Sequence, residues 1–281
     1  MTVISVPAST ANLGAGFDAL GMALDLRARV GLPGTAADPG AREADAQHPL
    51  AVAFAAAGGD GQLWVRSPIP AGRGLGFSGA MRVAGVVAAH VQRHGPDAVL
   101  PREDLLETAA RLEGHADNAA ASMFGGVVVA AAGRVVRIPS ALAPSVVVWV
   151  PTASQTSTEH SRRSLADTVS LADAAFNIGR ASLLVAALAA GDVASLRAAT
   201  EDRLHQQTRL ARVPATAEAL DAALAGPAWA AWLSGSGPSV AAMCDPADAH
   251  RVAAAMPAGG RCLVLAVATD GVMAAPGVNP G

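Results

Sequence analysis

A glycine-rich segment between a predicted strand and a strongly apolar helix is the feature that most restricts how this chain can fold. Residues 72–79 read Gly-Arg-Gly-Leu-Gly-Phe-Ser-Gly, and the helix is predicted to run from Ala80 to Gln92. Glycine allows positive φ and lets backbone N–H groups approach a ligand without a Cβ atom in the way. The helix start adds unpaired N–H groups and the positive end of its dipole. The segment predicts either an anion site suited to phosphate groups or a tight turn that needs glycine for packing alone.

Two glycine patterns raise the alternative of a dinucleotide site. G-x-G-x-x-G begins at Gly74, and the looser G-x-G-x-x-A begins at Gly14. Such a site needs a strand that runs directly into the first glycine, with an acidic residue at the end of the next strand. Pro68 and Pro70 stand between the strand and the later loop, and Pro7 follows the first strand. These interruptions argue against a dehydrogenase.

Length and composition exclude several classes of function. The 281 residues, 52% of them hydrophobic, suffice for two modest domains or one large one. All 20 basic residues are arginine, so chemistry that requires lysine, such as a Walker A loop or a Schiff base, is excluded. A net charge of -3 gives no basis for binding nucleic acid or an anionic membrane surface. Neither a signal segment nor a membrane span is evident, so we expect a cytoplasmic protein.

Helices and strands are predicted to alternate along the chain, without internal repeats. A domain boundary near residue 140 would divide it into 1–140 and 141–281, and residues 31–48 are expected to form a surface loop. Ser170 and Asp173 have the form of a capping box at the start of a helix that runs to about residue 190. Further helices are predicted over 51–57, 101–112, 192–204, 216–224 and 246–256, and strands over 2–6, 63–66, 135–138, 146–150, 229–233, 240–244 and 262–268.

Several separated motifs resemble one family when they are taken together. Residues 7–21 read Pro-Ala-Ser-Thr-Ala-Asn-Leu-Gly-Ala-Gly-Phe-Asp-Ala-Leu-Gly, residues 69–80 contain the glycine-rich loop, and residues 234–239 read Ser-Gly-Ser-Gly-Pro-Ser. In this order they resemble the three motifs of GHMP kinases, the first in the form found in homoserine kinases. The segments 113–118, 124–126, 157–162 and 201–206 resemble further homoserine-kinase signatures. The resemblance covers nearly the whole chain except roughly 31–61.

The resemblance implies an α+β protein with the two-domain GHMP kinase fold. The N-terminal, ATP-binding domain would resemble the ribosomal-S5-like fold, and the C-terminal domain would be ferredoxin-like. The implied activity is the transfer of a phosphoryl group from ATP, with Mg²⁺, to the side-chain hydroxyl of L-homoserine. Phosphoryl transfer depends mainly on positioning and electrostatic stabilisation. Family members are often homodimers, so a homodimer is expected.

The same resemblance assigns site residues by motif position. Asn12 and Asn118 would position the hydroxyl, and Asp117 is a candidate base, although the family is not thought to need one. Asp18 suits an ammonium, and arginines can clamp a carboxylate with paired hydrogen bonds. Ser78 and Glu107, eight residues before His115, would hold Mg²⁺ through hard oxygen ligands. The remaining substrate residues would be His115, Thr158, Arg162 and Arg209, and those at the nucleotide would be Gly72, Arg73, Gly74, Leu75, Gly76, Ser78, Gly79, Gly235, Ser236 and Gly237.

Three departures from the family pattern keep two alternatives open. Phe77 stands where the family's glycine-rich loop usually has serine, and Gly79 where it usually has alanine. The segment 31–61, which should help to build the adenine pocket, is short. Gln207-Thr208 replaces the usual Pro-Tyr before Arg209. The alternatives are a GHMP kinase for another small hydroxylated acid and a non-catalytic metabolite-binding relative.

Overall fold

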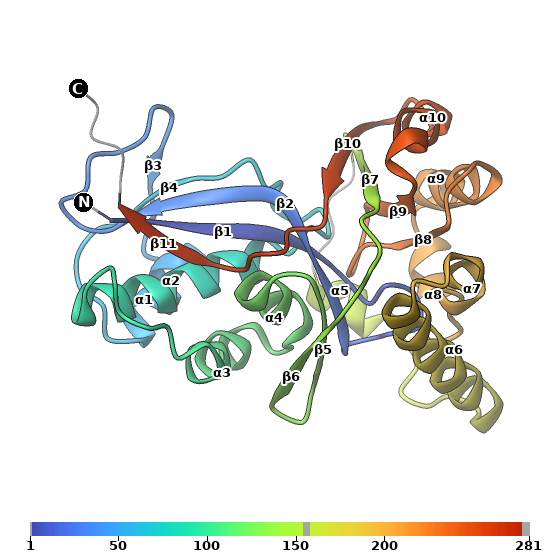
Figure 1. Ribbon diagram of the computed structural model, residues 1–281, viewed down its shortest axis with the longest axis horizontal. Coiled ribbons are helices and arrows are strands. Elements are labelled where there is room, and N and C mark those ends of the chain that lie inside the picture. Colours follow the sequence, from blue (N-terminus) through green and yellow to red (C-terminus); the bar gives the residue numbers. More distant parts are fainter. Residues whose placement is uncertain (1, 154–157, 277–281) are drawn as a thin grey trace.

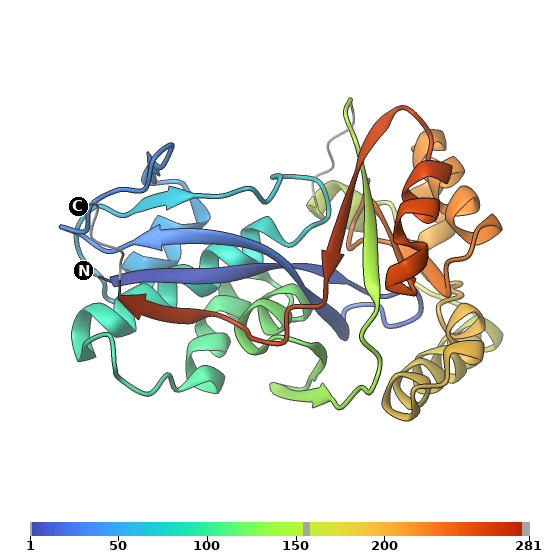
Figure 2. The same ribbon diagram turned by 45° about the horizontal axis from the view of Figure 1, so that its top comes forward.

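The computed structural model describes residues 2–153 and 158–276, which form two antiparallel sheets with helices packed on them (Figures 1 and 2). The larger sheet has seven strands in the order β11-β1-β2-β4-β3, with β5 also paired to β2 and β6 paired to β5. The smaller sheet has four strands in the order β10-β7-β9-β8. The chain is therefore an α+β protein, as predicted.

The N-terminal half builds most of the larger sheet and covers one of its faces with helices α1 to α4 (Figure 1). The longest of these helices, α2, buries an almost continuous alanine and valine face against β1, and it ends at Gly95. The strands are β1 (Thr2–Ala11), β2 (Leu20–Gly31), β3 (Arg42–Glu43), β4 (Trp64–Arg66), β5 (Val127–Ala131) and β6 (Arg134–Ile138), and the helices are α1 (Pro49–Ala56), α2 (Phe77–His94), α3 (Arg102–Glu113) and α4 (Asp117–Phe124).

The C-terminal half builds the smaller sheet, and its last strand returns to the larger one. Helices α9 and α10 pack on the smaller sheet, and α6 packs against α7 beside them (Figures 1 and 2). The elements are β7 (Ser145–Pro151), α5 (Thr158–Arg163), α6 (Leu171–Ala190), α7 (Val193–Ala199), α8 (Gln206–Leu210), α9 (Pro214–Ala225), β8 (Ala230–Leu233), β9 (Val240–Cys244), η1 (Pro246–Asp248), α10 (Ala249–Ala255), β10 (Gly260–Ala266) and β11 (Met273–Pro276).

Strand β11 pairs with β1, so the chain does not divide into two consecutive pieces. The strands change sheet between Ile138 and Ser145, close to the boundary predicted at residue 140. The division into 1–140 and 141–281 stays a prediction, and the pairing of β11 places residues 273–276 in the N-terminal sheet.

One predicted helix is too long. The helix expected over 192–204 ends at Ala199, because the next residues turn around the side chain of Asp202. Its carboxylate accepts hydrogen bonds from the backbone N–H groups of Leu204, His205 and Gln206 at 2.7–3.1 Å. An aspartate that binds nearby N–H groups in this way competes with helix formation. The predicted cap at Ser170 is present, and its hydroxyl accepts from the N–H of Asp173 at 3.0 Å.

Helix α6 is long and apolar enough to cross a membrane by length and composition alone, and 22% of its most apolar window is buried. It also carries Asn177, which is 4% exposed and donates to Asp202 at 2.7 Å. Arg180 of α6 pairs with Glu201 at 2.8 Å. These polar contacts attach the helix to the segment that precedes α8.

A buried chain of hydrogen bonds joins the two sheets at the end of β1. Trp232 of β8 donates its indole N–H to Thr10 Oγ1 at 2.9 Å, and Thr10 Oγ1 lies 2.8 Å from Ser234 Oγ. Ser234 donates in turn to the carbonyl of Gly74 at 2.6 Å. Thr10 and Ser234 are fully buried and Trp232 is 1% exposed. The Thr10 hydroxyl therefore links β1 to β8 and, through Ser234, to the glycine-rich loop.

We expect Thr10→Val to destabilise the protein by about 2 kcal/mol, because the isosteric change leaves buried polar partners unsatisfied. The measurement is urea unfolding followed by tryptophan fluorescence. The matched control is Thr168→Val, at an exposed position, which should shift the unfolding free energy by less than about 0.5 kcal/mol. Equal stability of the two variants would show that the Thr10 hydroxyl does not join the sheets.

Candidate active site

The glycine-rich loop has a backbone that only glycine fits easily. Gly72, Gly74 and Gly76 have φ of 66°, 73° and 65°. A Cβ atom on Gly74 would lie 2.2 Å from the carbonyl oxygen of Ser234, and one on Gly76 would lie 2.0 Å from Ser9 Oγ. The loop therefore needs glycine both for its conformation and for close contact with its neighbours. It leads directly into α2, whose first N–H groups lack partners within the helix.

The turn formed by residues 234–238 holds the loop against the rest of the site. Besides the bond from Ser234 to Gly74, the carbonyl of Gly235 accepts from Asn12 Nδ2 at 3.0 Å and from Arg209 Nη1 at 3.3 Å. The turn thus contacts the β1–β2 connection, the glycine-rich loop and α8. These three segments are far apart in the sequence, and the turn brings them to one place.

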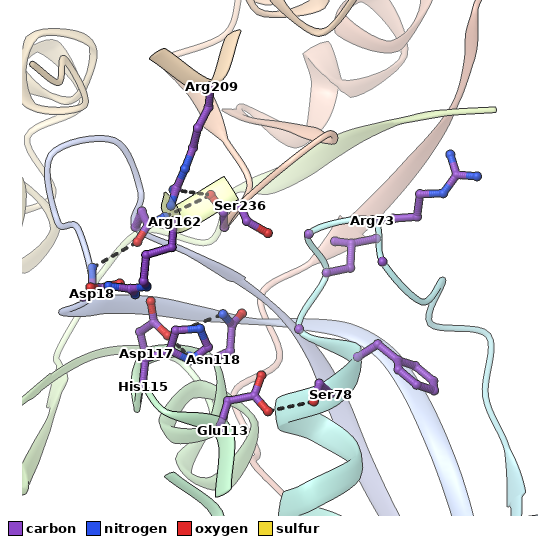
Figure 3. Close-up of a pocket in the computed structure, with 17 residues that line it drawn as sticks. Asp18, Arg73, Ser78, Glu113, His115, Asp117, Asn118, Arg162, Arg209 and Ser236 are labelled. Atoms are coloured by element: carbon purple, nitrogen blue, oxygen red, sulfur yellow. Dashed lines mark hydrogen bonds and ion pairs between the residues drawn. The ribbon is translucent and has the colours of Figure 1, made fainter. Parts of the chain in front are cut away.

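A pocket of about 160 Å³ lies where these segments meet (Figure 3). It gathers most of the residues predicted from the sequence, which come from the β1–β2 connection, the glycine-rich loop, the segment 115–118 and the C-terminal half of the chain. The predicted residues that line it are Asn12, Asp18, Gly72, Arg73, Gly74, Leu75, Gly76, Ser78, His115, Asp117, Asn118, Arg162, Arg209, Gly235 and Ser236.

Of the other predicted residues, Gly79, Gly237 and Glu107 do not line this pocket. Gly79 lies inside α2, where a Cβ atom would come within 3.2 Å of the backbone of Ala119, so it serves the packing of α2 on α4. A Cβ atom on Gly237 would meet the side chain of Leu233 at 2.9 Å. Glu107 lies elsewhere, and the side chain of Thr158 is outside the described residues.

One end of the pocket carries opposite charges. Asp18 pairs with Arg162 at 2.8 Å, and Arg209 lies beside them (Figure 3). The guanidinium carbons of Arg162 and Arg209 lie 5.5 and 5.4 Å from the centre of the Phe17 ring, within reach of a cation–π contact. The hydrogen bond that Arg162 donates to Asp18 raises the pKa of Arg162, whereas burial lowers the pKa of Arg209. A carboxylate next to two guanidinium groups is complementary to the zwitterion of an amino acid.

The β1–β2 connection presents Asp18 through an unusual backbone. Asn12 and Asp18 have φ of 69° and 56°, in the left-handed region that asparagine and aspartate adopt more readily than most residues. The Asn12 side chain accepts from the N–H of Asp18 at 3.1 Å while it donates to Gly235. Asn12 therefore fixes Asp18 to the 234–238 turn.

At the other end of the pocket, the carboxylate beside Ser78 belongs to Glu113, not to Glu107. Ser78 Oγ donates to Glu113 Oε2 at 2.7 Å, and Arg82 pairs with the same carboxylate at 3.2 Å (Figure 3). Glu107 lies six residues earlier on α3, which turns it by about 240° around the helix axis. It faces a neighbouring hollow instead. Glu113, and not Glu107, is thus the carboxylate that contacts Ser78, and the role of Glu107 as a metal ligand stays a prediction.

Between the two ends lie His115, Asp117 and Asn118 (Figure 3). Ser9 donates to Asn118 Oδ1 at 2.9 Å, so the N–H₂ group of Asn118 is a donor, and it reaches Asp117 Oδ1 at 3.4 Å. Asp117 is 2% exposed and accepts from the N–H of Asn118 at 2.7 Å. Burial raises the pKa of Asp117, and the nearby His115 acts against this rise. His115 Nδ1 is buried without a hydrogen-bond partner among the described residues, so it can bind a ligand.

A second hollow of about 640 Å³ adjoins the glycine-rich loop at Phe77. The Phe77 ring meets His48 edge-on, with their centres 5.7 Å apart. Arg73, by contrast, donates to the carbonyls of Pro151 and Thr152 and points away from the first pocket (Figure 3). Arg73 therefore lines the rim of the pocket with its guanidinium engaged elsewhere. The second hollow is lined by Arg27, Arg29, Gly40, Arg42, His48, Val65, Arg66, Ser67, Pro68 and Phe77.

Ser9, His48 and Glu113 are site residues that the sequence patterns did not identify. Glu113 is the first residue of the motif Glu-Gly-His-Ala-Asp-Asn and the last residue of α3. Its place in that motif was the signal that could have identified it. Ser9 lies within the Pro-Ala-Ser-Thr-Ala-Asn motif, and no spacing linked it to Asn118. His48 had no signal, because its contact with Phe77 depends on how α1 packs.

Comparison with known proteins agrees with this geometry. Residues 46–126 match the family described as GHMP kinases N terminal domain, and residues 184–262 match GHMP kinases C terminal. The chain is 36% identical to homoserine kinase of Desulfitobacterium hafniense over 91% of each chain. It is 38% identical to homoserine kinase of Thermus thermophilus over 93% of this chain and 94% of that protein.

Solved structures show the same architecture. The crystal structure of homoserine kinase from Cytophaga hutchinsonii superimposes with a TM-score of 0.83 at 25% identity, covering 98% of this chain and 97% of that chain. Mevalonate kinase of Methanococcus jannaschii shares the fold at 12% identity, with a TM-score of 0.69 over 94% and 98%. The chain therefore belongs to the GHMP kinases, and among them to the family of the homoserine kinases. The predicted two-domain GHMP kinase fold is confirmed.

We expect Gly76→Ala to destabilise the protein by about 3 kcal/mol, because a Cβ atom there meets Ser9 in addition to the strain of positive φ. Gly34→Ala is the matched control. Its φ of 78° is similar, but the added Cβ atom would meet none of the described residues within 4 Å, so the cost should be about 1 kcal/mol. Thermal and urea unfolding measure both variants. Equal costs would mean that the contact between the loop and β1 is not tight.

Proposed function

We propose that this chain is a homoserine kinase, which transfers the γ-phosphoryl group of ATP to the side-chain hydroxyl of L-homoserine. The observation that carries the proposal is the charge arrangement of the pocket. Asp18 and the pair Arg162 and Arg209 occupy one end, and Ser78 with Glu113 occupies the other, at the start of α2. A zwitterionic amino acid fits the first end and a phosphate chain fits the second.

L-homoserine would replace the ion pair between Asp18 and Arg162 with two new ones. Its ammonium group would bind Asp18, and its carboxylate would bind Arg162 and Arg209. Each charge of the site would then still have a partner of opposite charge. The side-chain hydroxyl would extend toward His115 and Asn118, in the direction of the glycine-rich loop.

The nucleotide would lie along the glycine-rich loop. Its phosphates would bind the backbone N–H groups of residues 74–79, where the dipole of α2 favours negative charge. Its nucleoside would enter the second hollow, beside the rings of His48 and Phe77. Ser78 and Glu113 offer the hard oxygen ligands that Mg²⁺ prefers while it also binds phosphates. Such an ion would neutralise charge on the transferring phosphoryl group.

Residues between the two ends would guide the hydroxyl. Asn118 is fixed by Ser9 so that its amide can donate to the hydroxyl oxygen. Asp117 is the carboxylate next to it, and a raised pKa makes a carboxylate a better proton acceptor near neutral pH. We infer that Asp117 accepts the proton of the substrate hydroxyl. This is the role of candidate base that the sequence suggested for it.

Two observations argue against the alternative functions. The carboxylate of Asp18 gives a reason to select an amino acid over a hydroxy acid without an ammonium group. The contact between Ser78 and Glu113 supports catalysis over binding alone. A homodimer, a cytoplasmic location and the absence of nucleic-acid or membrane partners stay predictions.

Because the pocket would bind both charges of the amino acid, analogues that lack either charge should be poorer substrates than L-homoserine. In a coupled ADP-release assay with Mg·ATP, we expect 4-hydroxybutanoate, which lacks the ammonium, and homoserinol, which lacks the carboxylate, to lose about 100-fold in kcat/KM. L-homoserine is the reference. Equal turnover of 4-hydroxybutanoate would favour a kinase for hydroxy acids. Absence of turnover with every analogue would favour a non-catalytic protein.

The position of Glu113 predicts a sharp contrast between two glutamates of the same helix. Glu113→Gln should lower kcat/KM by at least about 100-fold, because it removes negative charge where the metal ion would bind. Glu107→Gln should change it by less than about twofold, since Glu107 faces away from Ser78. Thermal unfolding checks that both variants fold. The reverse result would restore Glu107 as the metal ligand.

A further inference from the structure

His205 is a fully buried histidine whose two ring nitrogens both have partners of fixed chemistry. Nε2 lies 2.9 Å from the carbonyl oxygen of Gly14, and Nδ1 lies 3.1 Å from Arg209 Nη1. A carbonyl only accepts hydrogen bonds and a guanidinium only donates them. Nε2 must therefore carry the proton, and Nδ1 must accept from Arg209. The two neighbours define a neutral ring in the Nε2–H tautomer.

The same ring connects both sides of the charged end of the pocket. It stacks on Phe17 with the ring centres 5.0 Å apart, and through Gly14 it contacts the connection that carries Asp18. On its other side it holds Arg209, which also donates to Gly235. The ammonium side and the carboxylate side of the pocket are thus fixed to one another by His205.

The charged groups around His205 agree with a neutral ring. Burial lowers the pKa of His205, and Asp202, whose Oδ2 lies 3.8 Å from Nε2, acts against this effect. Arg209 faces Nδ1 and also lowers the pKa, whereas Asp18 raises it more weakly. Arg162 lies beyond Phe17. Asp202 already accepts three backbone N–H groups and the amide of Asn177, so it does not require a charged imidazole.

We propose that His205 is a positioning residue for the substrate carboxylate: as a neutral acceptor it aims the guanidinium of Arg209 into the pocket. This inference rests on the proposed function. Without His205, the guanidinium would keep the longer bond from Nη1 to the Gly235 carbonyl at 3.3 Å, and its Nε is buried without a partner among the described residues, so its orientation would be less fixed. Without the acceptor, the substrate would have to order Arg209 as it binds, which weakens binding of the amino acid and leaves the nucleotide unaffected.

Two isosteric variants separate this role from simple packing. In His205→Asn, the side-chain oxygen occupies nearly the place of Nδ1, so the acceptor for Arg209 is kept and the bond to Gly14 is lost. In His205→Gln, the amide can still reach toward Gly14 at the place of Nε2, but no acceptor stands at the place of Nδ1. The two variants therefore each remove one of the two bonds.

We expect His205→Gln to raise the KM for L-homoserine by about tenfold, the effect of losing a hydrogen bond to a charged group. His205→Asn should raise it by less than about threefold, and the KM for Mg·ATP and kcat should change by less than about twofold in both variants. Equal homoserine KM values in the two variants, or a parallel rise in the KM for Mg·ATP, would overturn the proposal.

A second measurement does not depend on turnover. In a long-range ¹H–¹⁵N spectrum of histidine-labelled protein, His205 should be a neutral Nε2–H tautomer at neutral pH, and Arg209→Leu should shift its Nδ1 resonance. A charged ring or the Nδ1–H tautomer would overturn the proposal. If the wild-type protein shows the expected tautomer but does not phosphorylate L-homoserine, the proposed function fails while the contact between His205 and Arg209 stands.

Discussion

The site depends on the turn formed by residues 234–238. Its serine hydroxyl binds the glycine-rich loop, and the carbonyl of Gly235 accepts from Asn12 and Arg209. Each contact comes from a different part of the chain, and Ser234 and Asn12 are at most 3% exposed. Because a buried polar group without a partner is costly, these segments are held together as a unit. A turn between two strands of the smaller sheet thus sets the geometry of a pocket built mostly by the larger one.

The charged side chains of the pocket have partners within the protein before a ligand binds. Burial lowers the pKa of Arg209, and the negative charge of Asp18 acts against this effect. A buried arginine needs acceptors, and Arg209 has His205 on one side and the Gly235 carbonyl on the other. A substrate carboxylate adds a charged acceptor to groups that are already in place. Binding then gains from electrostatic attraction without a large reorganisation of the protein.

Sequence patterns predicted the fold class and most of the pocket, because both depend on motifs whose chemistry is local. Glycines with positive φ, a capping serine and the order of the motifs can all be recognised in a single chain. Glu113 could not be chosen over Glu107 in this way, since the choice depends on which face of α3 meets α2. His205 and Ser9 act through partners 191 and 109 residues away, and no periodicity reports such contacts. The helix predicted over 192–204 failed for a related reason, because the carboxylate of Asp202 binds the following backbone.

The phenylalanine in the glycine-rich loop shows why such a site tolerates the loss of a hydroxyl. Phe77 is the first residue of α2, and its ring contacts His48 at the edge of the second hollow. The N–H groups of the first turn of α2 are still directed at the loop, whatever side chain stands at position 77. A phosphate held by backbone N–H groups and a helix dipole depends on the path of the chain, and glycines set that path. The residues that cannot change are therefore the glycines whose Cβ atoms would meet Ser9 and Ser234, and not the side chain that follows them.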